Sequence, residues 1–107
     1  MNASLDRLWG STLERLEMDI CRQGVALTAR VTSAASSTEH RLEFHQVSDV
    51  RFFNESPGPW DYAEITEVHV NGTASGGITA EIMLWSEDAG LVITAASVTC
   101  DGQSVPA

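Results

Sequence analysis

The sequence predicts a mainly β domain of the α+β class, in which a short N-terminal helix covers an antiparallel sheet or partly open barrel of about six strands. Two observations predict the sheet: apolar and polar residues alternate in several short segments, and turn-forming residues separate those segments at hairpin spacing. One stripe of apolar residues at helical spacing predicts the helix. A chain of 107 residues suits one core, so residues 1–107 are expected to form a single domain.

The helix is expected over residues 3–11. Ser4 is a residue type that caps helix N-termini, and Leu5, Leu8 and Trp9 follow it at spacings that place them on one helical face. This segment therefore predicts a short amphipathic helix ahead of the sheet.

The sheet is expected over about residues 14–100, followed by a flexible tail over residues 101–107. Strict alternation predicts a hairpin that turns at Gln23-Gly24. Residues 50–52 either continue the third strand or form a separate strand beyond a bend at 47–49. The expected strands cover residues 16–20, 25–32, 42–44 with 50–52, 60–70, 78–85 and 91–99.

Charge is distributed unevenly along the chain. The formal net charge is -9, there is no lysine, and all six arginines lie in the first 51 residues. Residues 52–107 hold eight acids and no Lys or Arg. This half is expected to repel nucleic acid and anionic membranes and to attract a cationic partner, although net negative charge also serves solubility alone.

The sequence holds no targeting or membrane signal of the usual kinds. The first residues lack the basic flank and apolar run of a signal peptide, and no apolar stretch approaches the roughly 20 residues that cross a bilayer. A cytoplasmic location is therefore expected.

No residue pattern predicts catalysis, a metal or a cofactor. Asp61, Glu64 and Glu67 are spaced three apart, so in a regular strand neighbouring pairs point to opposite faces, and only a bulge would bring one pair together. The three histidines lack the spacing of a metal site, and no serine lies in a nucleophile motif. The chain is expected not to be an enzyme.

Three aromatic residues offer a different kind of site. Trp60, Tyr62 and Trp85 can form a platform for a sugar ring, or the first two can anchor a strand to the core. Alternation places Trp85 on the same strand face as Glu81 and Met83. That face is the better candidate for an exposed apolar patch beside acids, as in protein interfaces.

Three segments, HRLEFHQVSDVRFF, PWDYAEITEV and GLVITAASV, resemble the YxiG-like family of small bacterial proteins. The resemblance rests on a structural signature made of Phe44, Val47, Trp60, Tyr62 and Glu64, together with Asp61 and Thr66. Some relatives are similar to products of toxin–immunity gene neighbourhoods. The resemblance therefore implies an immunity protein that neutralises a toxin by binding it, and it implies no catalytic residues.

The leading hypothesis is a non-enzymatic protein-binding domain whose acidic second half meets a basic toxin. One alternative is a small-molecule or carbohydrate-binding module, and another is a structural homo-oligomer that pairs through an exposed sheet edge. The residues expected to bind the partner are Glu81, Met83, Trp85, Glu87 and Asp88, with Asp61 and Glu67 as secondary candidates.

Overall fold

A computed structural model describes residues 5, 8–32, 34–55, 58, 59, 62–85 and 88–106. These residues form nine strands. They are β1 (Ser11–Asp19), β2 (Gly24–Thr32), β3 (Ser37–His45), β4 (Asp49–Asn54), β5 (Ala63–Gly72), β6 (Ile78–Leu84), β7 (Ala89–Ala95), β8 (Ser97–Cys100) and β9 (Gln103–Ser104).

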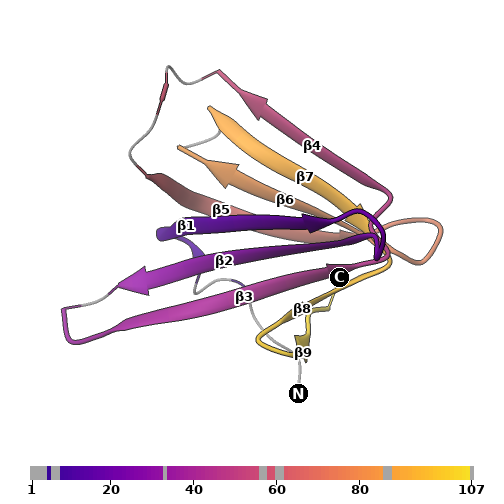
Figure 1. Cartoon of the computed structure of the whole chain (residues 1–107), viewed down its shortest axis with the longest axis horizontal. Helices are drawn as coiled ribbons and strands as arrows, with labels where there is room; N and C mark the ends of the chain where they lie inside the picture. The colour runs from indigo at the N-terminus through magenta and orange to yellow at the C-terminus, as the bar shows by residue number, and fades with distance from the viewer. Residues whose placement is uncertain are drawn as a thin grey trace.

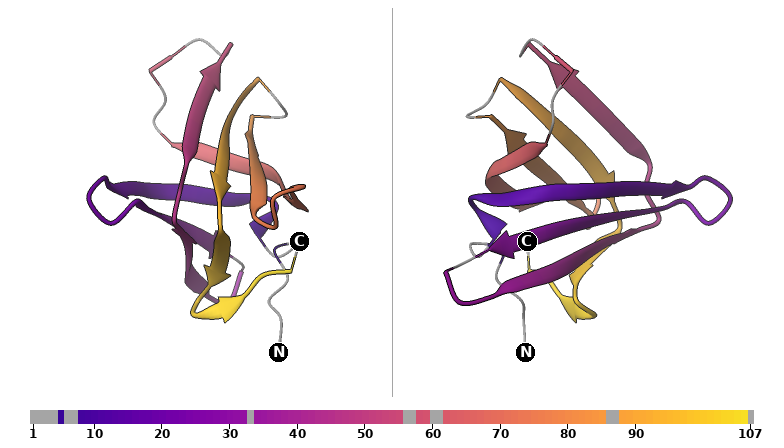
Figure 2. Two further views of the ribbon diagram at one scale, coloured as in Figure 1. Left: turned by 90° about the vertical axis from the view of Figure 1, so that its right-hand side faces the viewer. Right: turned by 60° about the vertical axis from the view of Figure 1, so that its left-hand side comes forward.

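All nine strands belong to one antiparallel sheet, in the order β4-β7-β6-β5-β1-β2-β3-β8-β9 (Figure 1). The sheet folds over on itself because β7 runs directly into β8 through a bend at Ala96. β7 pairs with β4 and β6, whereas β8 pairs with β3. The first layer is β4-β7-β6-β5 and the second is β1-β2-β3-β8-β9. β1 pairs with β5 but crosses β4, β7 and β6 steeply, and the β1–β2 hairpin tip projects beyond these strands (Figure 2).

The core fills the space between the two layers. Alternate side chains of β6 and β7 are buried, and the buried side chains of β2 and β3 meet them from the second layer. Ile82 and Ile93 are fully buried from the first layer, as are Leu27 and Leu42 from the second. The antiparallel sheet with one face on a core is confirmed, since period-2 alternation gives each strand one inner and one outer face.

The α+β class is wrong, because no helix is present among the described residues and nearly the whole chain is sheet. Within the segment expected to be helical, the Leu8 N–H donates to the Leu5 carbonyl at 3.0 Å, which closes a single turn. Both leucines are buried, so one turn already satisfies the apolar spacing that suggested a helix. Gly10 has a φ of 85° and donates to the Ile65 carbonyl, which draws the chain into β1. Ser4 lies outside the described residues.

The strand count of about six is also wrong, since short interruptions divide what the pattern joined. For residues 50–52 the alternative of a separate strand is confirmed, since they belong to β4 and are divided from β3 by a bend at Gln46, whose φ is 51°. Ala96 and Ser97 are both exposed, and this break in alternation separates β7 from β8. The segment expected as a tail contains β9. The hairpin turn at Gln23 is confirmed, with a φ of 55°.

Candidate functional site

The outer side chains of the first layer form a continuous surface, which we call the four-strand face. Strand register arranges these side chains in three rows that run across β4, β7, β6 and β5. The rows are Phe53–Gly90–Met83–Glu67, Arg51–Val92–Glu81–His69 and Asp49–Thr94–Thr79–Asn71.

Three of the residues expected to bind a partner come together on this face. Glu67 on β5 lies directly opposite Met83 on β6, and Glu81 lies one row further along β6. All three are half-buried, because the flanking positions Ile82 and Leu84 take the inner face. Directly opposite residues on one sheet face have Cβ atoms about 5 Å apart, so this group presents a compact surface.

A β-bulge in β5 adds a fourth member. The register shifts between Ile65 and Glu67, leaving Thr66 as an extra residue whose hydroxyl donates to the Met83 carbonyl at 3.2 Å. The shift places Glu64 and Glu67 on the same outer face, with Ile65 inward between them. Regular spacing had predicted opposite faces for this pair, and the bulge reverses that.

Aromatic and apolar groups surround the acids. At 5.6 Å between ring centroids, Trp9 packs edge-on against His69 beside β5, and 45% of Trp9 is exposed. The Phe53 ring covers Gly90, where an added Cβ would lie 2.7 Å from Phe53 Cζ. Val92 is half-buried between these groups. The four-strand face is therefore partly apolar across its width.

Trp85 follows β6 but does not continue its alternation. A φ of 53° turns its side chain, which is half-buried and packs against the core. Its ring centroid is 5.1 Å from that of Tyr62, which is 58% exposed. Asp88 is exposed in the turn after Trp85, and its carbonyl accepts the Glu55 N–H at 2.7 Å. Trp85 and Asp88 lie between the end of β6 and the start of β7, beside the four-strand face.

The other predicted site and signature residues are dispersed. Phe44 is a core residue of β3, and Val47 is half-buried between β3 and β4, where its N–H donates to the Gln23 carbonyl at 2.7 Å. Asp61, Glu87 and Trp60 lie outside the described residues, so the structure places only two of the three aromatics considered for a sugar platform.

Charges on the four-strand face are not balanced. Arg51 is the only Lys or Arg in residues 49–95, and its Nε lies 2.8 Å from the Asp49 carboxylate. Glu67 lies 2.8 Å from His69. Glu64 and Glu81 add two further acids without a further arginine in this layer. Over the described residues, the net charge of the face is therefore negative.

The opposite surface, on β1–β2–β3, differs because acids and arginines alternate across its strands. We call it the ladder face. Arg30 lies 3.0 Å from Glu14 on β1 and 2.8 Å from Glu39 on β3. The hydrogen bond from Arg30 to Glu14 and the Glu14 charge hold the pKa of Arg30 above its usual value, and Glu39 adds to this. The charges of this face largely neutralise one another.

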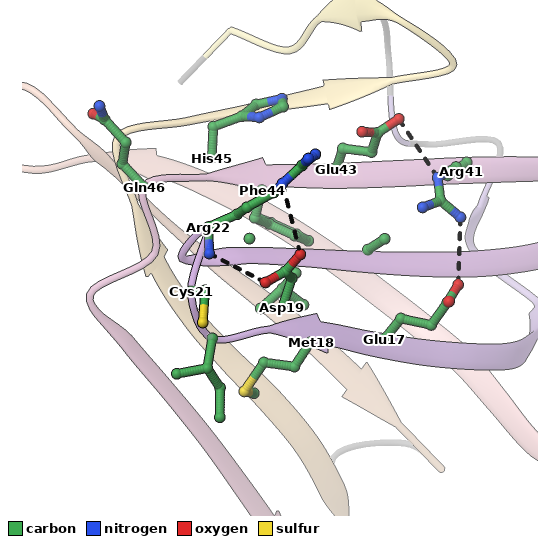
Figure 3. Close-up of a pocket in the computed structure, with 14 residues that line it drawn as sticks. Glu17, Met18, Asp19, Cys21, Arg22, Arg41, Glu43, Phe44, His45 and Gln46 are labelled. Atoms are coloured by element: carbon green, nitrogen blue, oxygen red, sulfur yellow. Dashed lines mark hydrogen bonds and ion pairs between the residues drawn. The ribbon is translucent and has the colours of Figure 1, made fainter.

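A shallow hollow of about 870 Å³ lies on the ladder face near the hairpin tip (Figure 3). Arg41 there contacts Glu17 and Glu43, each at 3.5 Å, and Arg22 contacts Asp19 at 3.9 Å. Because these charged groups are already paired, the hollow offers a ligand few unused charges.

Within the described ranges, no three His, Cys, Asp or Glu side chains gather as metal ligands. No helix in that part of the chain is long and apolar enough to cross a membrane.

Several residues of the four-strand face were not predicted. Phe53, Val92 and His69 belong to strands that the sequence indicated, and alternation with buried neighbours was the signal that they point outward. Their proximity depends on strand order. β4 lies beside β7 and not beside β3, and no local pattern shows that arrangement.

A family model described as YxiG-like protein matches residues 1–88. This range includes all of the four-strand face except the outward residues of β7 beyond Asp88. No curated protein matches the chain.

Proposed function

We propose that this chain, which belongs to the YxiG-like protein family, is a non-enzymatic protein-binding domain that uses the four-strand face to bind a cationic protein. One observation supports the proposal: among the described residues, the face joins half-buried apolar side chains to acids that outnumber the one arginine there, Arg51. A protein partner with a basic, partly apolar surface matches both properties.

The apolar part of the face supplies the contact area. Met83 and Val92 lie near its middle, between the Phe53 ring on one side and Trp9 on the other. Aromatic residues and Met are enriched in the centres of protein interfaces, where their burial provides much of the binding energy. Polar and charged groups around such a centre fix the orientation of the partner.

The acidic part supplies attraction and selectivity. Glu67 and Glu81 flank Met83, and Glu64 follows at the β5 bulge. Since the described arginines of the ladder face pair with acids of the second layer or its hairpin, their charge does not offset these glutamates. The resulting field accelerates encounter with a cationic partner and disfavours acidic ones.

Toxin immunity is the form of this proposal that the family resemblance favours. In that form the partner is a basic protein toxin, and binding to the four-strand face blocks it. The chain then needs no catalytic group of its own, because occupation of the toxin surface is sufficient for neutralisation.

The test begins with affinity capture from the organism that encodes the chain, followed by binding measurements with the purified partner. Met83→Ser and the double variant Glu67→Gln/Glu81→Gln are each expected to weaken binding at least about tenfold. Raising the salt concentration is expected to reduce wild-type affinity more than that of the double variant, since screening acts on charges that the variant lacks.

The matched control is Glu39→Gln/Glu43→Gln on the ladder face, which changes the net charge by the same amount. An equal loss of affinity in both double variants would refute a specific role for the four-strand face. An acidic partner, or binding that salt does not affect, would refute the electrostatic part. For toxin immunity, expression of the partner is expected to arrest growth unless the wild-type chain is present.

A further inference from the structure

We propose that two copies of this chain associate through the outer edge of β4, forming a twofold-symmetric dimer with a continuous sheet. β4 is the first strand of the sheet and pairs only with β7 among the described residues (Figure 1). An edge strand presents main-chain N–H and C=O groups that another strand can pair with. This inference concerns the open edge of β4, whose Asp49 and Arg51 also belong to the four-strand face, but it does not depend on the function proposed for that face.

The direction of the main-chain groups follows from one hydrogen bond. The Glu55 N–H donates to the Asp88 carbonyl at 2.7 Å, which continues the register in which Phe53 faces Gly90. Because hydrogen-bonding direction alternates along an antiparallel strand, odd-numbered residues of β4 bond to β7. The main-chain groups of Val50 and Phe52 therefore point to the outer edge.

Charge selects the register of the pairing. Asp49 and Arg51 alternate with Val50 and lie on the outer face of β4. If Val50 lies opposite Val50 of the second copy, each Asp49 lies opposite the other copy's Arg51. The twofold axis makes this pair twice, and the four charges alternate in sign across the junction.

Neighbouring registers are less favourable. A shift of one pairing step places Arg51 opposite Arg51, and the next step places Asp49 opposite Glu55, so both bring like charges together. A further step pairs Arg51 with Glu55, but it places Asp49 opposite Pro57, so the Asp49 of each copy has no opposite charge.

The favoured register also buries an exposed aromatic residue. Phe52 is 59% exposed although it shares the inner face of β4 with Val50. In this register it lies opposite Ser48 of the second copy, which precedes β4. The N–H of Ser48 already donates to its own chain's Thr94 carbonyl at 2.9 Å, so the Phe52 side chain and not a further Ser48 N–H bond extends the contact. Ser48 and Val50 line a hollow of about 420 Å³, whose other apolar walls include Met18 and Ile20 of the hairpin. Each Phe52 ring thus reaches the hollow of the other copy.

Electrostatics explains why the second copy selects this edge. A chain with a net charge of -9 repels its own copies, so a self-contact needs a locally neutral surface. β4 carries one acid and one base. In contrast, β1 pairs with β5 through only three described residues, so the rest of β1 is a second open edge. That part of β1 carries three acids, Glu14, Glu17 and Asp19, and one arginine. The β1 edge would repel an identical edge.

The test is analytical ultracentrifugation of the full chain across micromolar to millimolar concentrations. The wild type is expected to shift from one chain mass towards two. Arg51→Glu and Asp49→Arg each place like charges at both symmetric positions, and each is expected to raise the dissociation constant by at least about tenfold. The double variant Asp49→Arg/Arg51→Glu restores opposite charges and is expected to dimerise again.

The register has its own readout. With Cys21, which is exposed, replaced by Ser, a short thiol-specific crosslinker is expected to join two Val50→Cys chains far more efficiently than two Phe53→Cys chains. Efficient joining through Phe53→Cys instead would overturn the register. A wild type that stays monomeric at every concentration, or single-charge variants that dimerise as the wild type does, would overturn the proposal. Circular dichroism establishes that each variant is folded.

Discussion

The two outer surfaces of this folded sheet use charge in opposite ways. On the ladder face, Arg30 and Arg41 each contact acids from two neighbouring positions, and alternating signs cover β1–β2–β3. On the four-strand face, Arg51 contacts Asp49 while Glu64 and Glu81 remain in excess. The charges of the ladder face are paired with one another. The four-strand face keeps an excess of negative charge, and its electric field acts on other molecules.

This difference changes the meaning of the net charge. A total of -9 would suggest an acidic surface all round, yet among the described residues the ladder face pairs most of its acids with arginines, whereas Glu64 and Glu81 on the four-strand face make no ion pair. The number of surface ion pairs says little about stability, because exposed pairs contribute little each. The location of acids without a cationic neighbour says more about where a partner binds.

The largest expected effect tests whether both faces depend on one core. Phe44→Ala on β3 and Ile82→Ala on β6 each remove a side chain that is at most 2% exposed. Each is expected to lower the free energy of unfolding by about 2–5 kcal/mol, because the lost burial is compounded by a cavity. Urea denaturation followed by tryptophan fluorescence and by circular dichroism measures this.

The two layers share that core, so each variant is expected to show a single transition with coincident midpoints in both measurements. Separate transitions for the two layers would contradict a shared core. They would also mean that each face can be altered without affecting the other.

A smaller effect is expected from Gly90→Ala, which probes the packing of the four-strand face itself. The new Cβ would lie 2.7 Å from Phe53 Cζ and 3.0 Å from the Ile82 carbonyl oxygen, so the ring must move. We expect a loss of about 1–3 kcal/mol by urea denaturation. The same substitution in a Phe53→Ala background is expected to cost less, since the ring contact is gone. An equal cost in both backgrounds would show that the main chain, and not Phe53, limits the space.

The smallest effects compare one glutamate from each face. Glu39→Gln removes an ion pair with Arg30 and is expected to lower the melting temperature slightly, by less than Gly90→Ala does. Glu81→Gln removes an acid from the face with excess negative charge, and it is expected to leave the melting temperature unchanged or raise it. High salt is expected to reduce both effects. A larger destabilisation by Glu81→Gln than by Glu39→Gln would contradict the contrast between the two faces.

The sequence predicted the strands more reliably than their boundaries. Alternation in β2 and β6 separated the inner residues from the outer ones, because in these strands one face is buried almost throughout. It failed before Ser11, where two leucines at helical spacing reach the core through a single turn. It also predicted opposite faces for Glu64 and Glu67, because a bulge at Thr66 is set by pairing with β6.

The candidate site was predicted only in part, because local alternation places residues of one strand together but does not show which strands are neighbours. Glu81 and Met83 share a strand, so local alternation was enough to place them together. Trp85 follows them in the sequence, but its positive φ removes it from that alternation. Phe53 and Val92 join the face through β4 and β7, whose adjacency involves residues far apart in the chain.

By itself, the sequence determined which side chains of the central strands are buried and that the second half carries acids without Lys or Arg. Both are local properties, fixed by alternation and by composition. Only the tertiary structure decided that β7 turns into β8 at Ala96, that β4 ends the sheet with an open edge, and that the paired and unpaired charges lie on opposite surfaces. These features depend on long-range pairing, in which strands distant in the chain compete for the same edges, and no local period records the outcome.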